Sequence, residues 1–118
     1  MTFLCPTLAR AVALLCLSQP LAADTGEVVQ SIIGRTLVGS EASHSIIHAD
    51  GSLEGRYNGI AFSGKWYLDG DQYCREFTRG IALAQSCVQV RADRDAAGRI
   101  VGVIFVGDGY RTQFHLMD

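Results

Sequence analysis

The chain has 118 residues, of which 48% are hydrophobic and 19% charged, and its formal net charge at pH 7 is −2. Nucleic acids and anionic membranes attract clustered positive surface, so this composition argues against both as partners. The length is that of one small domain.

Residues 1–23 are expected to be a secretory signal peptide. Arg10 precedes the apolar run AVALLCL, and the alanine-rich end Leu21–Ala22–Ala23 follows a polar break. This order is typical of a signal peptide that is cut after Ala23. The apolar run is shorter than the roughly 20 residues that a membrane-spanning helix needs. We therefore expect residues 24–118 to form a single periplasmic or secreted domain with no membrane span after cleavage.

The start of this domain predicts one short helix. Asp24 is a candidate N-cap with Glu27 three residues later, and Gly34 can supply the left-handed stop. The apolar residues between them share one helical stripe, namely Val28, Val29, Ile32 and Ile33. A helix of two or three turns does not persist alone, so we expect the stripe to pack on the rest of the domain.

After Gly34 the chain alternates between strand-like runs and turn signals. The runs recur about every ten residues, separated by Asp-Gly and similar pairs, which indicates an antiparallel meander. We predict an all-β barrel or sandwich of seven to eight strands with the helix packed over it. The predicted strands are Thr36–Val38, Ser45–Ala49, Leu53–Ala61, Phe62–Leu68, Gln72–Thr78, Cys87–Ala92, Ile100–Val106 and Tyr110–Met117.

The predicted core comes from the period-2 alternation along these strands. The run Ile100–Val106 is apolar on both faces, so we expect a central strand or one covered outside by the helix. The predicted core residues are Phe62, Trp66, Leu68, Val88, Val90, Ile104 and Phe114.

Cys74 and Cys87 are expected to form one disulfide. Of the four cysteines, Cys5 and Cys16 lie in the predicted signal peptide. The two that remain in an exported chain are most simply a single bridge, since their spacing does not fit a redox CxxC motif. If strands 72–78 and 87–92 pair around the loop 80–85, the two cysteines lie opposite each other within disulfide range.

Neither the acidic turn nor the histidines match a metal site. In GKWYLDGDQYCREF, a calcium loop starting at the first aspartate would need glycine at its sixth position, where Cys74 stands. His44 and His48 would lie about 13 Å apart on a strand, too far to bind one zinc ion. We predict no metal site here and a simple hairpin turn at residues 69–71.

The segments GRTLVG (34–39), DGSLEGRYNG (50–59) and GKWYLDGDQYCREF (64–77), with Cys87 and the last two strands, resemble a group of small exported bacterial proteins of unknown function. The resemblance covers nearly all of residues 24–118. Such sequences often carry the name dihydrodipicolinate reductase, which implies an NAD(P)H-dependent enzyme with a Rossmann domain. Gly107–Asp108–Gly109 lacks the third glycine and the helix that hold a dinucleotide. We therefore transfer no catalytic residues and expect no cofactor.

The candidate binding residues are Arg75, Tyr73 and Tyr57. An inward Arg75 beside Tyr73 and Phe77 would place a charge in an otherwise apolar pocket. We favour a periplasmic binding or interaction module, which holds a small apolar ligand in a barrel mouth or docks on an envelope protein.

The alternative is a periplasmic enzyme, such as a hydrolase with its site on the loops. Catalysis needs a nucleophile or a base held by a partner, and the sequence shows no such pair, so the catalytic residues stay unassigned. Convergence of Arg75, Tyr57, His48 and His115 on one concavity would favour the enzyme.

Overall fold

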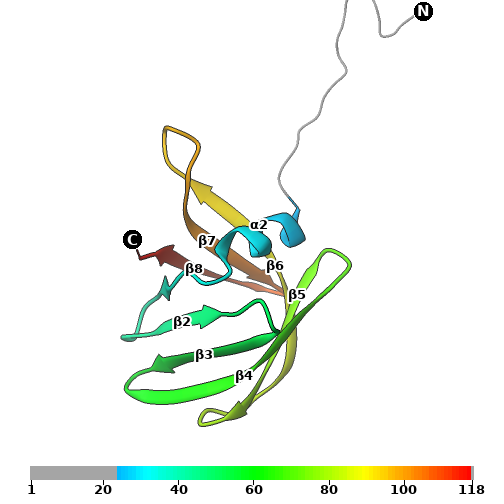
Figure 1. Cartoon of the computed structure of the whole chain (residues 1–118), viewed down its shortest axis with the longest axis vertical. Helices are drawn as coiled ribbons and strands as arrows, with labels where there is room; N and C mark the ends of the chain where they lie inside the picture. Colours follow the sequence, from blue (N-terminus) through cyan, green and yellow to red (C-terminus); the bar gives the residue numbers. More distant parts are fainter. Residues whose placement is uncertain (1–23, 118) are drawn as a thin grey trace, which may run out of the picture.

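Eight strands follow one another around a closed antiparallel barrel in the computed structural model, which describes residues 24–117 (Figure 1). The predicted all-β class with a short N-terminal helix is thereby confirmed, and the closure is a barrel. The predicted signal peptide lies outside the described residues. The elements are α2 (Thr25–Ile32), β1 (Leu37–Val38), β2 (His44–Ile47), β3 (Ser52–Tyr57), β4 (Ile60–Asp69), β5 (Gln72–Arg79), β6 (Leu83–Arg94), β7 (Ile100–Gly107) and β8 (Tyr110–Leu116).

Helix α2 begins and packs as its sequence predicts. The Asp24 side chain accepts a hydrogen bond from the backbone N–H of Glu27 at 2.8 Å, which caps the first turn. The helix buries Val28, Val29 and Ile32 against the barrel. No helix within residues 24–117 combines the length and the apolarity needed to cross a membrane.

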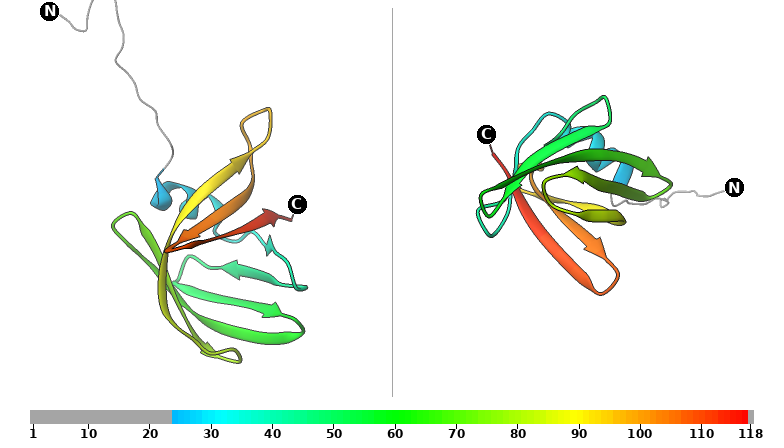
Figure 2. Two further views of the ribbon diagram at one scale, coloured as in Figure 1. Left: turned by 180° about the vertical axis from the view of Figure 1, so that it is seen from behind. Right: turned by 90° about the horizontal axis from the view of Figure 1, so that it is seen from below.

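The helix covers an edge that the barrel leaves open. In the strand register, the pairing of β5 with β6 ends at Tyr73 and Val88, while β6 continues to Arg94. Beyond that point Thr25 takes the place of a neighbouring strand, because its hydroxyl oxygen accepts a hydrogen bond from the backbone N–H of Val90 at 3.0 Å. Asp71 accepts a second bond from the Thr25 N–H at 3.1 Å. Figure 2 shows α2 between the tips of the β4–β5 and β6–β7 hairpins.

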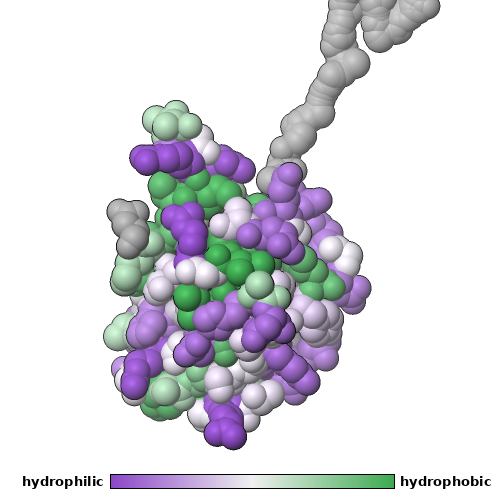
Figure 3. All heavy atoms as spheres, viewed as in Figure 1, coloured by the Kyte–Doolittle hydropathy of each residue, from purple (hydrophilic) through white to green (hydrophobic). Residues whose placement is uncertain are grey.

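The barrel has two different ends. Because the strands run alternately up and down, the β2–β3, β4–β5 and β6–β7 turns lie at the end where α2 packs. The β1–β2, β3–β4, β5–β6 and β7–β8 turns lie at the opposite end, which we call the mouth. On the face that carries α2, apolar surface gathers beside the helix and hydrophilic side chains surround it (Figure 3).

The closure of the barrel depends on its shortest strand. β1 is two residues long and pairs with β2 on one side and with β8 on the other. On the β8 side, Leu37 lies opposite Leu116 and Val38 opposite His115. The backbone N–H of Met117 donates to the carbonyl of Thr36 at 2.9 Å and extends this pairing by one bond.

The core confirms most of the predicted residues and corrects one. Phe62, Trp66, Val88 and Val90 are buried, and Leu68 and Phe114 pack partly buried against them. The prediction for Ile104 is wrong, because Val103 and Phe105 on either side of it face the interior and are buried. The helix packs mainly on β5 and β6, and Val101 of β7 is exposed.

Two predicted strand boundaries are also wrong. The predicted loop 80–85 is shorter, because β6 begins at Leu83, which pairs with Phe77, and not at Cys87. The run Leu53–Ala61 is divided by a tight turn at Asn58–Gly59, where both residues have positive φ angles of 51° and 85°. This pair of left-handed residues forms the hairpin turn that matches the twist of antiparallel strands. β3 therefore ends at Tyr57, and β4 begins at Ile60.

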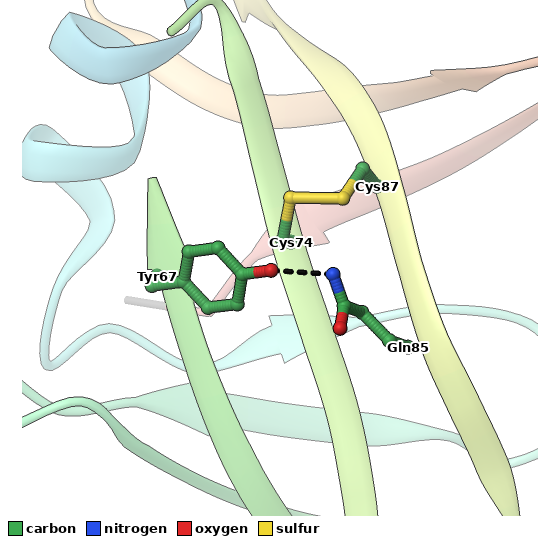
Figure 4. The surroundings of a disulfide bond; sticks show 4 residues. All are labelled: Tyr67, Cys74, Gln85 and Cys87. Carbon is green, nitrogen blue, oxygen red and sulfur yellow. Dashed lines mark hydrogen bonds between the residues drawn. A yellow bond between two sulfur atoms is a disulfide. The ribbon is translucent and has the colours of Figure 1, made fainter. Parts of the chain in front are cut away.

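The predicted disulfide between Cys74 and Cys87 is confirmed. The two residues are direct partners across β5 and β6, with Cα atoms 4.0 Å apart. Their neighbours Tyr73 and Val88 face the core, so the bridge lies on the outer face of the barrel. Figure 4 shows the side chain of Gln85 donating a hydrogen bond to the hydroxyl of Tyr67 beside the bridge.

Candidate functional site

A cavity of about 300 Å³ occupies the mouth end of the barrel. It runs from an exposed rim, which includes Ser40 and Tyr57, to a buried floor at Tyr73 and Phe105. The lining residues come from seven strands and two loops: Ser40, Ser43, His44, Ser45, Ile47, Leu53, Tyr57, Phe62, Tyr73, Arg75, Phe77, Ile81, Ala82, Leu83, Phe105, Thr112 and Phe114.

Aromatic rings form most of the inner wall. Phe62 stacks on Phe77 with ring centroids 4.3 Å apart. Phe105 contacts Phe114 at 4.9 Å and Tyr73 at 5.6 Å in tilted arrangements. Ring faces and edges packed at these distances make a firm apolar surface, as small-ligand cavities in proteins commonly have.

Arg75 carries the one permanent charge among the lining residues. Its guanidinium carbon lies 5.1 Å from the ring centroid of Phe105 and 5.9 Å from that of Tyr73, both within cation–π range. Its Nη1 atom is buried, and no atom of residues 24–117 accepts a hydrogen bond from it. The cavity therefore contains the positive charge of Arg75, which lies against two aromatic rings and has one N–H donor without an acceptor among the described residues.

Tyr73 lies at the floor of the cavity and is only 4% exposed. Burial raises the pKa of its hydroxyl to about 12, although the charge of Arg75 opposes that shift. The hydroxyl is therefore uncharged at physiological pH. It can donate or accept a hydrogen bond without adding charge to the cavity.

All three candidate binding residues line this one cavity. Arg75 and Tyr73 are on β5, and Tyr57 is at the end of β3, where it is 46% exposed at the rim. The sequence indicated an inward Arg75 beside Tyr73 and Phe77, and the structure has that arrangement. That these residues bind a ligand stays a prediction.

Arg75, Tyr57, His48 and His115 do not all converge on the cavity, because only Arg75 and Tyr57 line it. His48 and His115 are not among the lining residues. His48 instead forms a hydrogen bond of 2.8 Å to the carboxylate of Glu54, an exposed pair that sequence reasoning missed. The signal for it was available, because β2 and β3 are joined by a short hairpin that brings residues 48 and 54 together.

His44 is a rim residue that the sequence presented only as a possible metal ligand. It stands at the mouth end of β2, whereas His48 follows the other end of that strand. Within the part of the chain that the structure describes, no group of three or more histidine, cysteine or acidic side chains could hold a metal ion.

The disulfide fastens the strand that carries the cavity's charge. Cys74 lies between Tyr73 and Arg75 on β5. Its partner Cys87 lies on β6 next to Ser86, which is the register partner of Arg75. Figure 4 shows the bridge between the two strands. The bridge therefore holds the two strands together directly behind the floor of the cavity.

A scan against protein-family models finds no match to this chain, and neither does a search of curated proteins or of solved structures. The resemblance to small exported proteins of unknown function stays a prediction, and so does the expectation that the chain binds no dinucleotide.

Proposed function

We propose that the protein is an exported binding module that holds a small, largely apolar ligand inside its barrel. The observation that carries the proposal is the cavity of about 300 Å³ with its aromatic wall. This volume is at the lower end of the range for small-molecule sites, roughly 300–1,000 Å³. An eight-stranded barrel is wide enough to hold one small ligand where side chains do not fill it.

The frame around the cavity supports this role. Hydrogen-bonded strands surround the cavity, and the disulfide joins β5 to β6 beside it. A site that is formed before the ligand arrives loses less conformational entropy on binding than a flexible one. Such a barrel binds its ligand with little rearrangement.

A neutral fluorescent probe tests the proposal. Phenylnaphthylamine is apolar and gains fluorescence when it leaves water, so titration with the purified protein reports binding in the cavity. Ala82 lines the mouth, and Ala84 on β6 is exposed and outside the cavity. We expect Ala82→Trp to weaken probe binding at least tenfold and Ala84→Trp to leave it unchanged. Failure of the wild-type protein to bind, or equal binding by Ala82→Trp, would refute the proposal.

Export is the second part of the proposal. It is supported by the signal-like pattern of residues 1–23 and by the paired cysteines, since disulfides persist in oxidising compartments. Cell fractionation, with mass spectrometry of the N-terminus, tests it. We expect a chain that begins at Asp24 in the periplasmic or extracellular fraction, and a full-length cytoplasmic chain would contradict export.

A further inference from the structure

Arg75 points to the chemical class of the ligand. We propose that the cavity takes an amphipathic monocarboxylate, whose head group pairs with Arg75 and whose apolar chain extends toward the mouth. This inference rests on the proposed binding function and adds the charge, the shape and the orientation of the ligand.

Arg75 has unmet hydrogen-bonding capacity. A buried donor without an acceptor is rare in proteins and unfavourable, and more so when the donor is charged. Within residues 24–117, Nη1 of Arg75 is buried without an acceptor, and no carboxylate lies within ion-pair distance of the guanidinium. The three ion pairs in this part of the chain involve other residues. A ligand carboxylate would supply both the acceptor and the opposite charge.

Two aromatic rings hold the guanidinium of Arg75 in the cavity. Phe105 and Tyr73 lie within cation–π distance of Arg75, and ring faces of this kind favour a positive charge in an apolar place. Rings do not satisfy the N–H groups in the plane of the guanidinium. Those groups form the planar fork that binds a carboxylate through two parallel hydrogen bonds. The aromatic neighbours thus keep the charge inside the barrel while the fork stays available.

The charge balance of the cavity favours a single negative charge on the ligand. Arg75 is the one lining residue with a permanent charge, and the lining has no acidic side chain. A monocarboxylate neutralises Arg75, whereas a phosphate dianion would bring an unbalanced negative charge into an apolar site, which is costly. A neutral ligand would leave the guanidinium unpaired.

The packing on either side of Arg75 sets the direction of the ligand. Toward the helix end, the buried side chains of Trp66, Tyr73 and Val88 fill the barrel. Toward the mouth, Phe77 and Leu83 line the open cavity. The head group therefore lies deep at Arg75, and the chain lies along the apolar wall with its end near the rim.

Isothermal titration calorimetry with three ligands of equal chain length tests the inference. Decanoate carries the proposed head group, decanol is its neutral counterpart, and decyl phosphate carries the alternative anionic head. We expect decanoate to bind about 10–100-fold more tightly than decanol, the ratio expected for charge-assisted hydrogen bonds. We expect decyl phosphate to bind more weakly than decanoate.

Variants of two arginines assign the effect to Arg75. In Arg75→Met the preference for decanoate over decanol should disappear, while decanol affinity stays within about threefold of wild type. Arg75→Lys keeps the charge without the fork, so its affinity for decanoate should fall between those of the wild type and Arg75→Met, and it supplies the test if the methionine variant does not fold. The control is Arg91→Met, because Arg91 is exposed on β6 outside the cavity. It should bind decanoate as the wild type does.

The outcomes separate this inference from the proposed function. Equal binding of decanol and decanoate, or undiminished decanoate binding by Arg75→Met or Arg75→Lys, would overturn the monocarboxylate and leave the apolar binding function standing. Tighter binding of decyl phosphate would overturn the choice of head group. Absence of binding by all three ligands and by phenylnaphthylamine would overturn the inference together with the proposed function.

Discussion

Replacing Thr25 by valine tests how helix α2 is held on the barrel. The hydroxyl of Thr25, which is 2% exposed, accepts a hydrogen bond from the buried N–H of Val90 at 3.0 Å. Valine has nearly the same shape, so the substitution leaves no cavity and removes only the acceptor. A buried N–H that loses its partner costs about 1–3 kcal/mol. A domain of this size unfolds about 4–8 °C lower for each kcal/mol lost.

Urea unfolding followed by tryptophan fluorescence measures this loss, because Trp66 is the single tryptophan and is buried in the core. Thr25→Ser is the matched control, since it keeps the hydroxyl and removes one methyl group, at a cost of roughly 0.5–1.5 kcal/mol. We expect the valine variant to be the less stable of the two. Equal or greater stability of Thr25→Val would show that the hydroxyl does not anchor the helix, and the account of the covered β6 edge would be wrong.

Four further variants test the frame of the barrel and its helix. The double variant Cys74→Ala/Cys87→Ala should lose about 3 kcal/mol of unfolding free energy, because the bridge closes a loop with a sequence separation of 13; a loss below about 1 kcal/mol in urea unfolding would contradict this. Burial raises the pKa of Tyr73 to about 12 from its ordinary value of 10.0, so its contribution to stability is complete below pH 10 and is lost as pH rises from 10 to 12. The loss is at most roughly 3 kcal/mol, and unfolding across this pH range should show a shallower decline in Tyr73→Phe than in the wild type, whereas parallel declines would count against a buried hydroxyl. Gly64→Ala should lower the stability by about 1–3 kcal/mol, because the added Cβ would overlap the backbone of Glu76. Gly26→Ala, in the first turn of α2 with only ordinary contacts around its Cβ, should raise the stability by roughly 0.5–1 kcal/mol; melting temperatures that move the same way in both variants would refute the comparison.

Local signals predicted the elements of this fold well where one face of a segment is polar. The cap at Asp24 and the stripe through Val28 and Ile32 define a helix that the structure contains almost unchanged. Likewise, the alternation around Trp66 assigns its side chain to the correct face of β4. In each case a single periodic pattern has only one way to bury its apolar residues.

The prediction for Ile104 failed because its segment is apolar on both faces. Ile100–Val106 is apolar at nearly every position, so alternation cannot say whether Ile104 or its neighbours Val103 and Phe105 face inward. That choice depends on the register with β6 and β8. The turn at Asn58–Gly59 was a readable hairpin signal, and the apolar pair that follows it hid the break between the two strands.

The candidate site was only partly visible in the sequence. Arg75 could be placed inside because Tyr73 and Phe77, two positions away on either side, share its face of the strand. Its ring partner Phe105 is thirty residues away, and the rim residue His44 comes from a different hairpin. Contacts between distant strands follow from how the barrel closes, and no local pattern encodes that closure.

The two-residue strand β1 is the least extensively paired strand of the barrel. Closed barrels avoid aggregation because they have no free strand edges. If Leu37 and Val38 separate from both β2 and β8, edges on these two strands are exposed together, and the detached segment includes α2. Two copies opened in this way can each insert that segment into the other and recover every native contact, as in domain swapping. Mild destabilisation at high protein concentration would therefore give intertwined dimers built of intact barrels before it gives disordered aggregates.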